Sequence, residues 1–183
     1  MKIIRTLIIL LRKLPVVCLV IALLKMLVGR FKFSRLYKGN VIQMEDGIVF
    51  KIFRDITLIR NKTILDPITV NDSCVFIVRF KFSKLSHRAN KIVSVIPMLI
   101  IAGSPGFEQK IYAVNPDNGY WQGMYQWQSL AHLEDYKRSF IYRMMNRRAV
   151  PESIKTMQWK NQTLDNFIRH HTDKQFNPNK SQK

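Results

Sequence analysis

Two β-forming runs separated by a dense turn signal constrain the fold of this chain more than any other feature. The first run is residues 107–114 and the second is residues 120–128, and between them residues 115–119 read Asn-Pro-Asp-Asn-Gly. These residue types favour a tight turn, so the two runs are predicted to pair as a β-hairpin. Alternate residues of the second run share one face, which is aromatic except at Gly123.

Upstream of the hairpin, the sequence predicts a strand and then a helix. Residues 75–82 alternate, with Phe side chains on one face and Arg79 on the other, as in a half-buried strand. Apolar residues at helical spacing predict a helix over 87–102, with Ser86 as its N-cap. Pro97 is expected to kink this helix or to end its first part.

Downstream of the hairpin, a helix is predicted over 130–148 with Ser129 as its N-cap. A last strand over 153–159 and a short helix over 163–171 follow, and the polar tail from residue 172 is expected to be disordered. From the first strand onward, the order is therefore β-α-β-β-α-β. This order predicts an α+β, ferredoxin-like fold, with an antiparallel sheet and two helices on one face.

The N-terminal segment is apolar and basic. Residues 14–24 form an apolar run that Lys25 interrupts, and a bilayer requires about 20 apolar residues to be spanned. The favoured interpretation is a single N-terminal membrane anchor, with flanking lysines and arginines reaching the headgroups. An amphipathic helix lying in the membrane plane is the alternative, and small residues for signal-peptide cleavage are missing. The anchor's orientation stays open, although the basic stretch 30–38 favours a cytoplasmic main domain.

The charge distribution favours anionic partners. The formal charge is +18, from 30 basic and 12 acidic residues, and the first 40 residues contain no acid. Phospholipid headgroups and nucleic acid both suit such a chain. Nucleic acid is disfavoured because the Phe-rich strand lacks the Gly-Phe-Gly pattern of RNA-binding sheets and because the basic segment adjoins an apolar run. Cys18 and Cys74 have no metal-ligand spacing and are interpreted as small buried hydrophobes.

Four segments follow from this pattern. Residues 1–38 form the hydrophobic helix and a basic connector, and residues 39–72 form a β-ribbon extension whose turn is Asp46-Gly47. Residues 73–162 are the ferredoxin-like domain. Residues 163–183 are the short helix and the polar tail.

The domain also resembles a known family. The carrying features are Pro-Gly-Phe at 105–107, Asn-Pro at 115–116, Gly-Met-Tyr-Gln-Trp at 123–127, and the approach to the last strand at 150–153. Over about 85 residues, 75–159, the chain resembles the antibiotic-biosynthesis-monooxygenase-like proteins of the dimeric α+β barrel superfamily.

The resemblance implies a homodimer formed sheet to sheet and an apolar pocket between the sheet and the helices of each subunit. Some members of the family oxidise polycyclic phenols with oxygen and neither metal nor flavin, and others degrade haem. The residue set of the haem degraders has no match here, so no cofactor and no metal are expected.

Six residues are candidates for lining such a pocket. Arg79 would bind an anionic or phenolic ligand, two tyrosine hydroxyls would hydrogen-bond a ligand oxygen, and three aromatic rings would stack on a flat ligand. Each also has a structural interpretation, as a surface or dimer-interface charge or as core packing. The candidates are Arg79, Tyr112, Trp121, Tyr125, Trp127 and Tyr136.

No catalytic group is assigned from the sequence. His87 and His132 are potential bases, but both are expected at the surface, and the adjacent pair His170-His171 does not share a helix face. Paired carboxylates, a Ser-His-Asp order, a phosphate-binding glycine loop and a cysteine cluster are all missing from the sequence.

Two functions therefore stay open. The first is a membrane-anchored, monooxygenase-like protein that oxidises or binds an apolar small molecule without a cofactor. The alternative is a non-catalytic membrane-associated module whose basic surface binds anionic lipid or a protein partner. A closed apolar cavity with an inward polar group would favour the first hypothesis.

Overall fold

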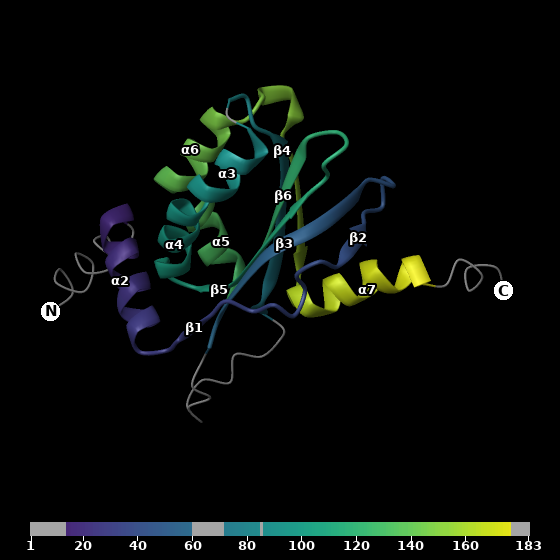
Figure 1. The fold of residues 1–183 in the computed structure, drawn as a ribbon. Coiled ribbons are helices and arrows are strands. Elements are labelled where there is room, and N and C mark those ends of the chain that lie inside the picture. Colours follow the sequence, from purple (N-terminus) through teal and green to yellow (C-terminus); the bar gives the residue numbers. More distant parts are fainter. Residues whose placement is uncertain (1–13, 60–71, 85, 177–183) are drawn as a thin grey trace, which may run out of the picture.

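A single antiparallel sheet organises the chain (Figure 1). The computed structural model describes residues 14–59, 72–84 and 86–176. The strand order is β1-β3-β5-β6-β4-β7, and β2 pairs with β3 beside this path. The strands are β1 (Phe31–Lys32), β2 (Val41–Gln43), β3 (Val49–Leu58), β4 (Cys74–Lys81), β5 (Phe107–Val114), β6 (Tyr120–Trp127) and β7 (Lys155–Lys160).

Four of these strands form the arrangement expected from the sequence. They lie in the order β7-β4-β6-β5, which is compatible with a ferredoxin-like fold. The β5–β6 hairpin closes at Asn115, whose side-chain oxygen accepts hydrogen bonds from the backbone N–H groups of Asp117 and Asn118. The ribbon residues add to the same sheet, because β3 pairs along the free edge of β5. The turn between β2 and β3 contains Asp46-Gly47, where a hairpin is expected.

The two predicted helices on one face are each divided in two. The first consists of α3 (His87–Val93) and α4 (Val95–Gly103), and the second of α5 (Leu130–Lys137) and α6 (Phe140–Arg148). The first break falls at Ser94 and not at Pro97, because Pro97 lies in the first turn of α4, where a backbone N–H has no helical partner to lose. The second break was missed: the Ser139 hydroxyl accepts a hydrogen bond from the backbone N–H of Tyr142 and begins a new helix.

Helix α2 (Pro15–Leu27) lies against α4. The contact is close because it joins small residues: Cys18 and Ala22 are buried, and a Cβ on Gly103 would lie 1.7 Å from the carbonyl oxygen of Cys18. Among the described residues, no helix combines the length and apolarity required to cross a bilayer. The predicted membrane-spanning anchor therefore finds no support there, and its first thirteen residues lie outside the described part.

The other face of the sheet is covered by the ribbon and by α7 (Leu164–Phe176) (Figure 1). Leu164, Phe167 and Ile168 are buried against the sheet, and the hydroxyl of Tyr37 donates to Asp165 at 2.7 Å. The last helix is longer than predicted, so the expected disorder is wrong for residues 172–176. Packing of its apolar side on the sheet stabilises it beyond its own propensity. Residues 177–183 of the tail and residues 60–71 of the predicted ribbon extension lie outside the described residues.

Candidate functional site

A small apolar cavity lies between strands β5 and β6 and helices α4 and α6. It encloses about 50 Å³, which is room for a few water molecules. Four of the six residues selected from the sequence line it together: Tyr112, Trp121, Tyr125 and Tyr136. Two methionines of α6, Met144 and Met145, complete one wall together with Arg148, Pro97 and Ile101.

The register of the β5–β6 hairpin explains how the aromatic residues converge. Lys110 is opposite Tyr125 and Tyr112 is opposite Gly123, and all four positions face the helices. A Cβ on Gly123 would lie 2.9 Å from the Tyr125 ring. The Tyr125 ring thus occupies the space that any other residue at 123 would fill, so the missing side chain shapes this cavity wall.

Two tyrosine hydroxyls form a pair in the cavity wall. The rings of Tyr125 and Tyr136 lie 5.2 Å apart, and each hydroxyl affects the pKa of the other. Burial raises the pKa of both hydroxyls above its usual value, and it raises that of Tyr112 likewise. The hydroxyl of Tyr112 donates to the Ser94 carbonyl at 3.4 Å. These groups therefore stay protonated at neutral pH and are available as hydrogen-bond donors.

Lys110 is the cavity residue that the sequence interpretation missed. It is only 3% exposed, and its amine lies 4.1 Å from the Tyr112 ring centre and 4.5 Å from that of Tyr125. Burial, assisted by the nearby charge of Arg54, lowers its pKa well below the usual lysine value. The signal was present in the sequence, because residues two apart in a strand share a face and Tyr112 had been selected.

Trp121 borders the cavity, whereas Trp127 belongs to the core. The indole N–H of Trp121 donates to Nδ1 of His87 at 2.9 Å, which ties the predicted base His87 to structure outside the cavity. Trp127 is fully buried, with its ring 5.0 Å from Tyr136 and 5.9 Å from Phe107. Core packing is therefore the role that its contacts support.

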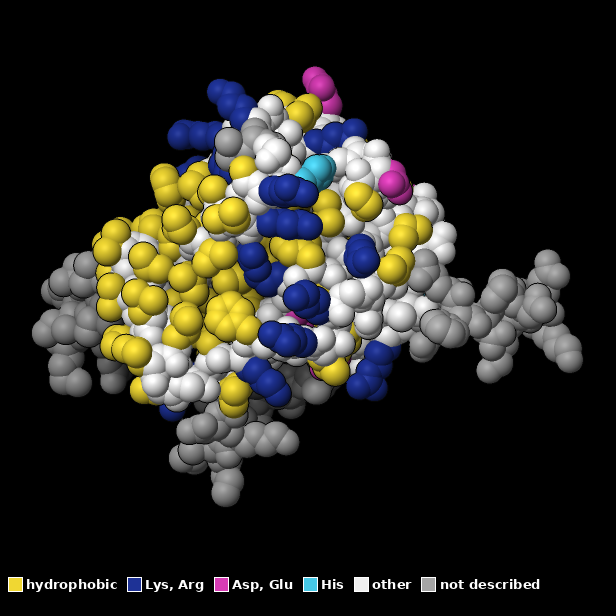
Figure 2. Space-filling view, in the orientation of Figure 1, with side chains coloured by type: hydrophobic (Ala, Val, Ile, Leu, Met, Phe, Trp, Pro, Cys, Tyr) yellow, Lys and Arg dark blue, Asp and Glu magenta, His cyan; other side chains and the backbone are white. Residues whose placement is uncertain are grey.

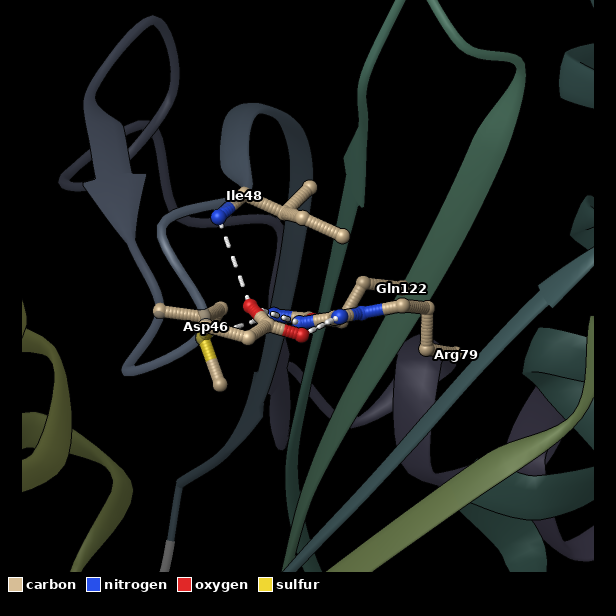
Figure 3. Close-up of polar contacts among 5 residues, drawn as sticks. Asp46, Ile48, Arg79 and Gln122 are labelled. Atoms are coloured by element: carbon tan, nitrogen blue, oxygen red, sulfur yellow. Dashed lines mark hydrogen bonds and ion pairs between the residues drawn. The ribbon is translucent and has the colours of Figure 1, made fainter.

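Arg79 lies on the opposite face of the sheet, away from the cavity (Figure 3). Its guanidinium pairs with Asp46 from the β2–β3 turn and its Nε donates to Gln122 at 3.3 Å. It also lies 4.8 Å from the ring centre of Phe50. The hydrogen bond from Arg79 lowers the pKa of the Asp46 carboxyl. The structure thus does not bring Arg79 together with the aromatic candidates.

A larger hollow opens between one end of strands β3, β5 and β6 and helix α7. It has a volume of about 490 Å³, and most of its lining residues are of polar types, with Glu108, Asp165 and Arg169 among them. Asp165 already accepts the Tyr37 hydroxyl, and Glu108 accepts the Gln126 amide at 2.6 Å. Gln126 in turn accepts the backbone N–H of Leu164 at 2.8 Å, which joins the start of α7 to β6. Within the described ranges, no three His, Cys, Asp or Glu residues are grouped so as to hold a metal ion.

The comparisons with known proteins give little beyond this geometry. No protein-family model matches the sequence, and a search of curated proteins finds no match. Among solved structures, one described as a crystal structure study of an anthrone oxidase-like protein is similar at a TM-score of 0.40 and 12% identity. The likeness covers 63% of this chain and 57% of that one, so the chain spans little more than half of the solved protein.

Proposed function

We propose that the protein binds an apolar small molecule in the cavity between β5, β6, α4 and α6, in the manner of a cofactor-independent monooxygenase. The observation that carries this proposal is the convergence of Tyr112, Trp121, Tyr125 and Tyr136 on one cavity with a buried amine at its wall. Apolar walls with a few inward polar groups are typical of small-molecule sites. The same proposal includes a homodimer of the α+β barrel kind.

The size of the cavity sets a condition on the ligand. At about 50 Å³ it does not hold an aromatic ring without movement of its walls. Met144 and Met145 supply that movement, because methionine side chains are flexible and adapt to irregular shapes. A flat ligand would enter beside α6 and stack on Trp121, while its oxygen would receive hydrogen bonds from the tyrosine hydroxyls.

A matched pair of variants tests the site. Tyr136→Phe removes a hydroxyl from the cavity wall. Tyr120→Phe removes a hydroxyl from β6 at a position outside the cavity. Binding of apolar phenols, quinones and haem by the full-length chain is measured by thermal shift and tryptophan fluorescence. A phenol or quinone that stabilises wild type and Tyr120→Phe, but stabilises Tyr136→Phe less, supports the proposal. No stabilisation by any compound of the panel contradicts it.

Oxidation is tested separately. If the bound compound is a substrate, oxygen uptake accompanies product formation in a metal-free buffer, and Tyr136→Phe slows both. A bound compound with no oxygen uptake assigns binding without catalysis.

A second candidate function, association with an anionic membrane surface, is favoured by an exposed apolar patch. Figure 2 shows hydrophobic side chains gathered over the side where α2 and α4 lie, bordered by lysines and arginines. Val16 is 72% exposed, Leu27 83% and Ile92 74%, which is unusual for large apolar side chains grouped together. The basic border would complement lipid phosphates.

Sedimentation with vesicles tests this second candidate. The full-length chain should bind vesicles of phosphatidylcholine and phosphatidylglycerol more strongly than phosphatidylcholine alone, and less strongly as salt increases. Leu27→Gln with Val20→Gln should weaken this binding, whereas Val49→Gln on β3 should leave it unchanged. If wild type, the double variant and Val49→Gln bind the vesicles equally, the apolar patch is not the membrane-binding surface.

A further inference from the structure

Lys110 is a buried amine without a counter-charge. Among the described residues, its Nζ forms no hydrogen bond and no ion pair, and only the rings of Tyr112 and Tyr125 approach it. Lysines are almost never fully buried unless they are paired. The fold therefore buries the Lys110 amine in its aromatic cavity although no hydrogen bond or ion pair within the described residues holds it there.

The surroundings of this nitrogen favour its neutral form. Arg54 lies against the same Tyr112 ring, 5.8 Å from its centre, and hydrogen bonds to Ser94 Oγ at 2.8 Å and to the Lys91 carbonyl at 2.9 Å hold it there. The cavity's second cation, Arg148, donates to Asn90 at 2.9 Å. Desolvation and a neighbouring cation are the two conditions that turn a lysine into a nucleophile. The remaining titratable groups of the wall are tyrosines, which carry no charge at neutral pH.

We propose that the cavity takes a small apolar aldehyde or ketone and that Lys110 Nζ forms an imine with it. The nitrogen lone pair attacks the carbonyl carbon, the C–N bond forms, and a proton passes from nitrogen to the carbonyl oxygen. The carbinolamine then loses its hydroxyl as water and the C=N bond forms, so no oxidant or reductant is consumed. This inference rests on the proposed function, because the same cavity must admit the ligand.

The cavity wall assists both stages of the reaction. The hydroxyls of Tyr125 and Tyr136, which line the same cavity, are placed to give a proton to the departing hydroxyl and to take one back from solvent. The rings of Tyr112 and Tyr125, whose centres lie within 4.5 Å of Nζ, are placed to pack against the C=N group once it has formed. The largely apolar wall also limits the water that would hydrolyse the imine.

Reductive trapping tests the inference on the full-length chain. The protein is incubated with benzaldehyde near neutral pH, treated with cyanoborohydride, digested and mapped by mass spectrometry. Lys81 is a matched control inside the same chain, because its amine lies 4.6 Å from the centre of the Tyr120 ring but on the accessible side of the molecule. We expect Lys110 to be labelled at least tenfold faster than Lys81.

The pH profile gives a second readout. Labelling of Lys110 should change little between pH 6 and 8, because burial lowers the pKa of its amine. Lys110→Arg should remove the fast label and Lys81→Met should leave it intact. Labelling of Lys110 that is no faster than that of Lys81 overturns the inference.

Binding measured in parallel separates the two proposals. If benzaldehyde or benzyl alcohol binds in a manner sensitive to Tyr136→Phe but Lys110 is not labelled, the imine is wrong and the apolar site stands. If benzoate binds more tightly than both and no label forms, Lys110 is a counter-charge for a carboxylate, which also overturns the imine. If none of the three binds and no label forms, both proposals fail.

Discussion

Each face of the sheet buries one cation, and the two cations differ in whether an acidic side chain pairs with them. On the face covered by α7 and the ribbon, Arg79 is 1% exposed and has Asp46, Gln122 and the Phe50 ring as partners. On the face covered by α3 to α6, Lys110 is 3% exposed and has only aromatic rings. A buried charge that is fully partnered indicates structure, and one left without partners indicates a site.

The largest effect is expected when the partnered cation loses its acid. Asp46→Ala leaves the buried Arg79 guanidinium with Gln122 and the Phe50 ring, so the free energy of unfolding should fall by about 3 kcal/mol. Urea denaturation measures it. The neighbouring exposed acid provides the control, since Glu45→Ala should cost little. Adding Arg79→Met to Asp46→Ala should recover part of the loss, and a double variant less stable than Asp46→Ala would contradict the buried pair.

A smaller loss is expected when the cavity wall is filled. Gly123→Ala places a methyl group against the Tyr125 ring and should cost about 1–3 kcal/mol of stability through overpacking. The displaced ring should also weaken binding of any cavity ligand, measured by thermal shift. Replacing the ring that the new methyl group contacts, in Gly123→Ala/Tyr125→Leu, should restore stability in part. If Gly123→Ala alone matches wild type in both measurements, the wall has room that the structure does not show.

Removing the unpartnered cation should stabilise the protein. The pKa of Lys110 is lowered in the folded chain, so the unfolded chain binds more protons at neutral pH and folding pays a cost that grows as pH falls. Lys110→Met should raise the free energy of unfolding near pH 7 by about 1 kcal/mol. The gain should shrink as pH rises toward the ordinary lysine pKa. Lys81→Met, at an accessible position, should show no such gain.

The smallest effect concerns an acid on the α7-covered face. Burial raises the pKa of Asp55 to about 6, against hydrogen bonds from Gln109 and Thr57 that lower it. Stability from its protonated form is present below about pH 4 and is lost as pH rises through about 6. Asp55→Asn should therefore make the free energy of unfolding less dependent on pH over this range. At pH 7 it should raise that free energy by about 1 kcal/mol, after allowance for screening. Asp117→Asn, at an exposed position, is the control and should change the free energy of unfolding at pH 7 little.

The same contrast explains what the sequence could predict. The bounds of β5 match the prediction and those of β6 differ by one residue, because the turn chemistry of residues 115–119 is local. The breaks at Ser94 and Ser139 depend on how short helices fit the sheet, and the length of α7 depends on a surface built by distant strands.

The sequence predicted those parts of the candidate site that follow from alternation along a strand and from helical spacing. Alternation put Trp121 and Tyr125 on one face of the second run, and the helix pattern put Tyr136 on the apolar face of its helix; in the structure all three line the cavity. It could not reveal that Asp46, 33 residues from Arg79, would reach across the sheet to neutralise it. That Lys110 has no acidic partner is likewise a property of the assembled fold, because it depends on which side chains other elements bring next to its amine.

The sheet-to-sheet homodimer stays a prediction. In this chain Val75, Ile77 and Met124 of that face are already buried by the ribbon and α7. A second sheet would therefore have to dock beside these elements and not on a bare face.

The contact of Gly103 with Cys18 has a mechanical consequence. No side chain stands between the α2 and α4 backbones at this point to absorb a shift. Pro97 and Ile101 of α4 form part of the cavity wall, so a displacement of α2 would be passed through α4 to that wall. A molecule bound against the exposed side of α2 would therefore act on the shape of the cavity.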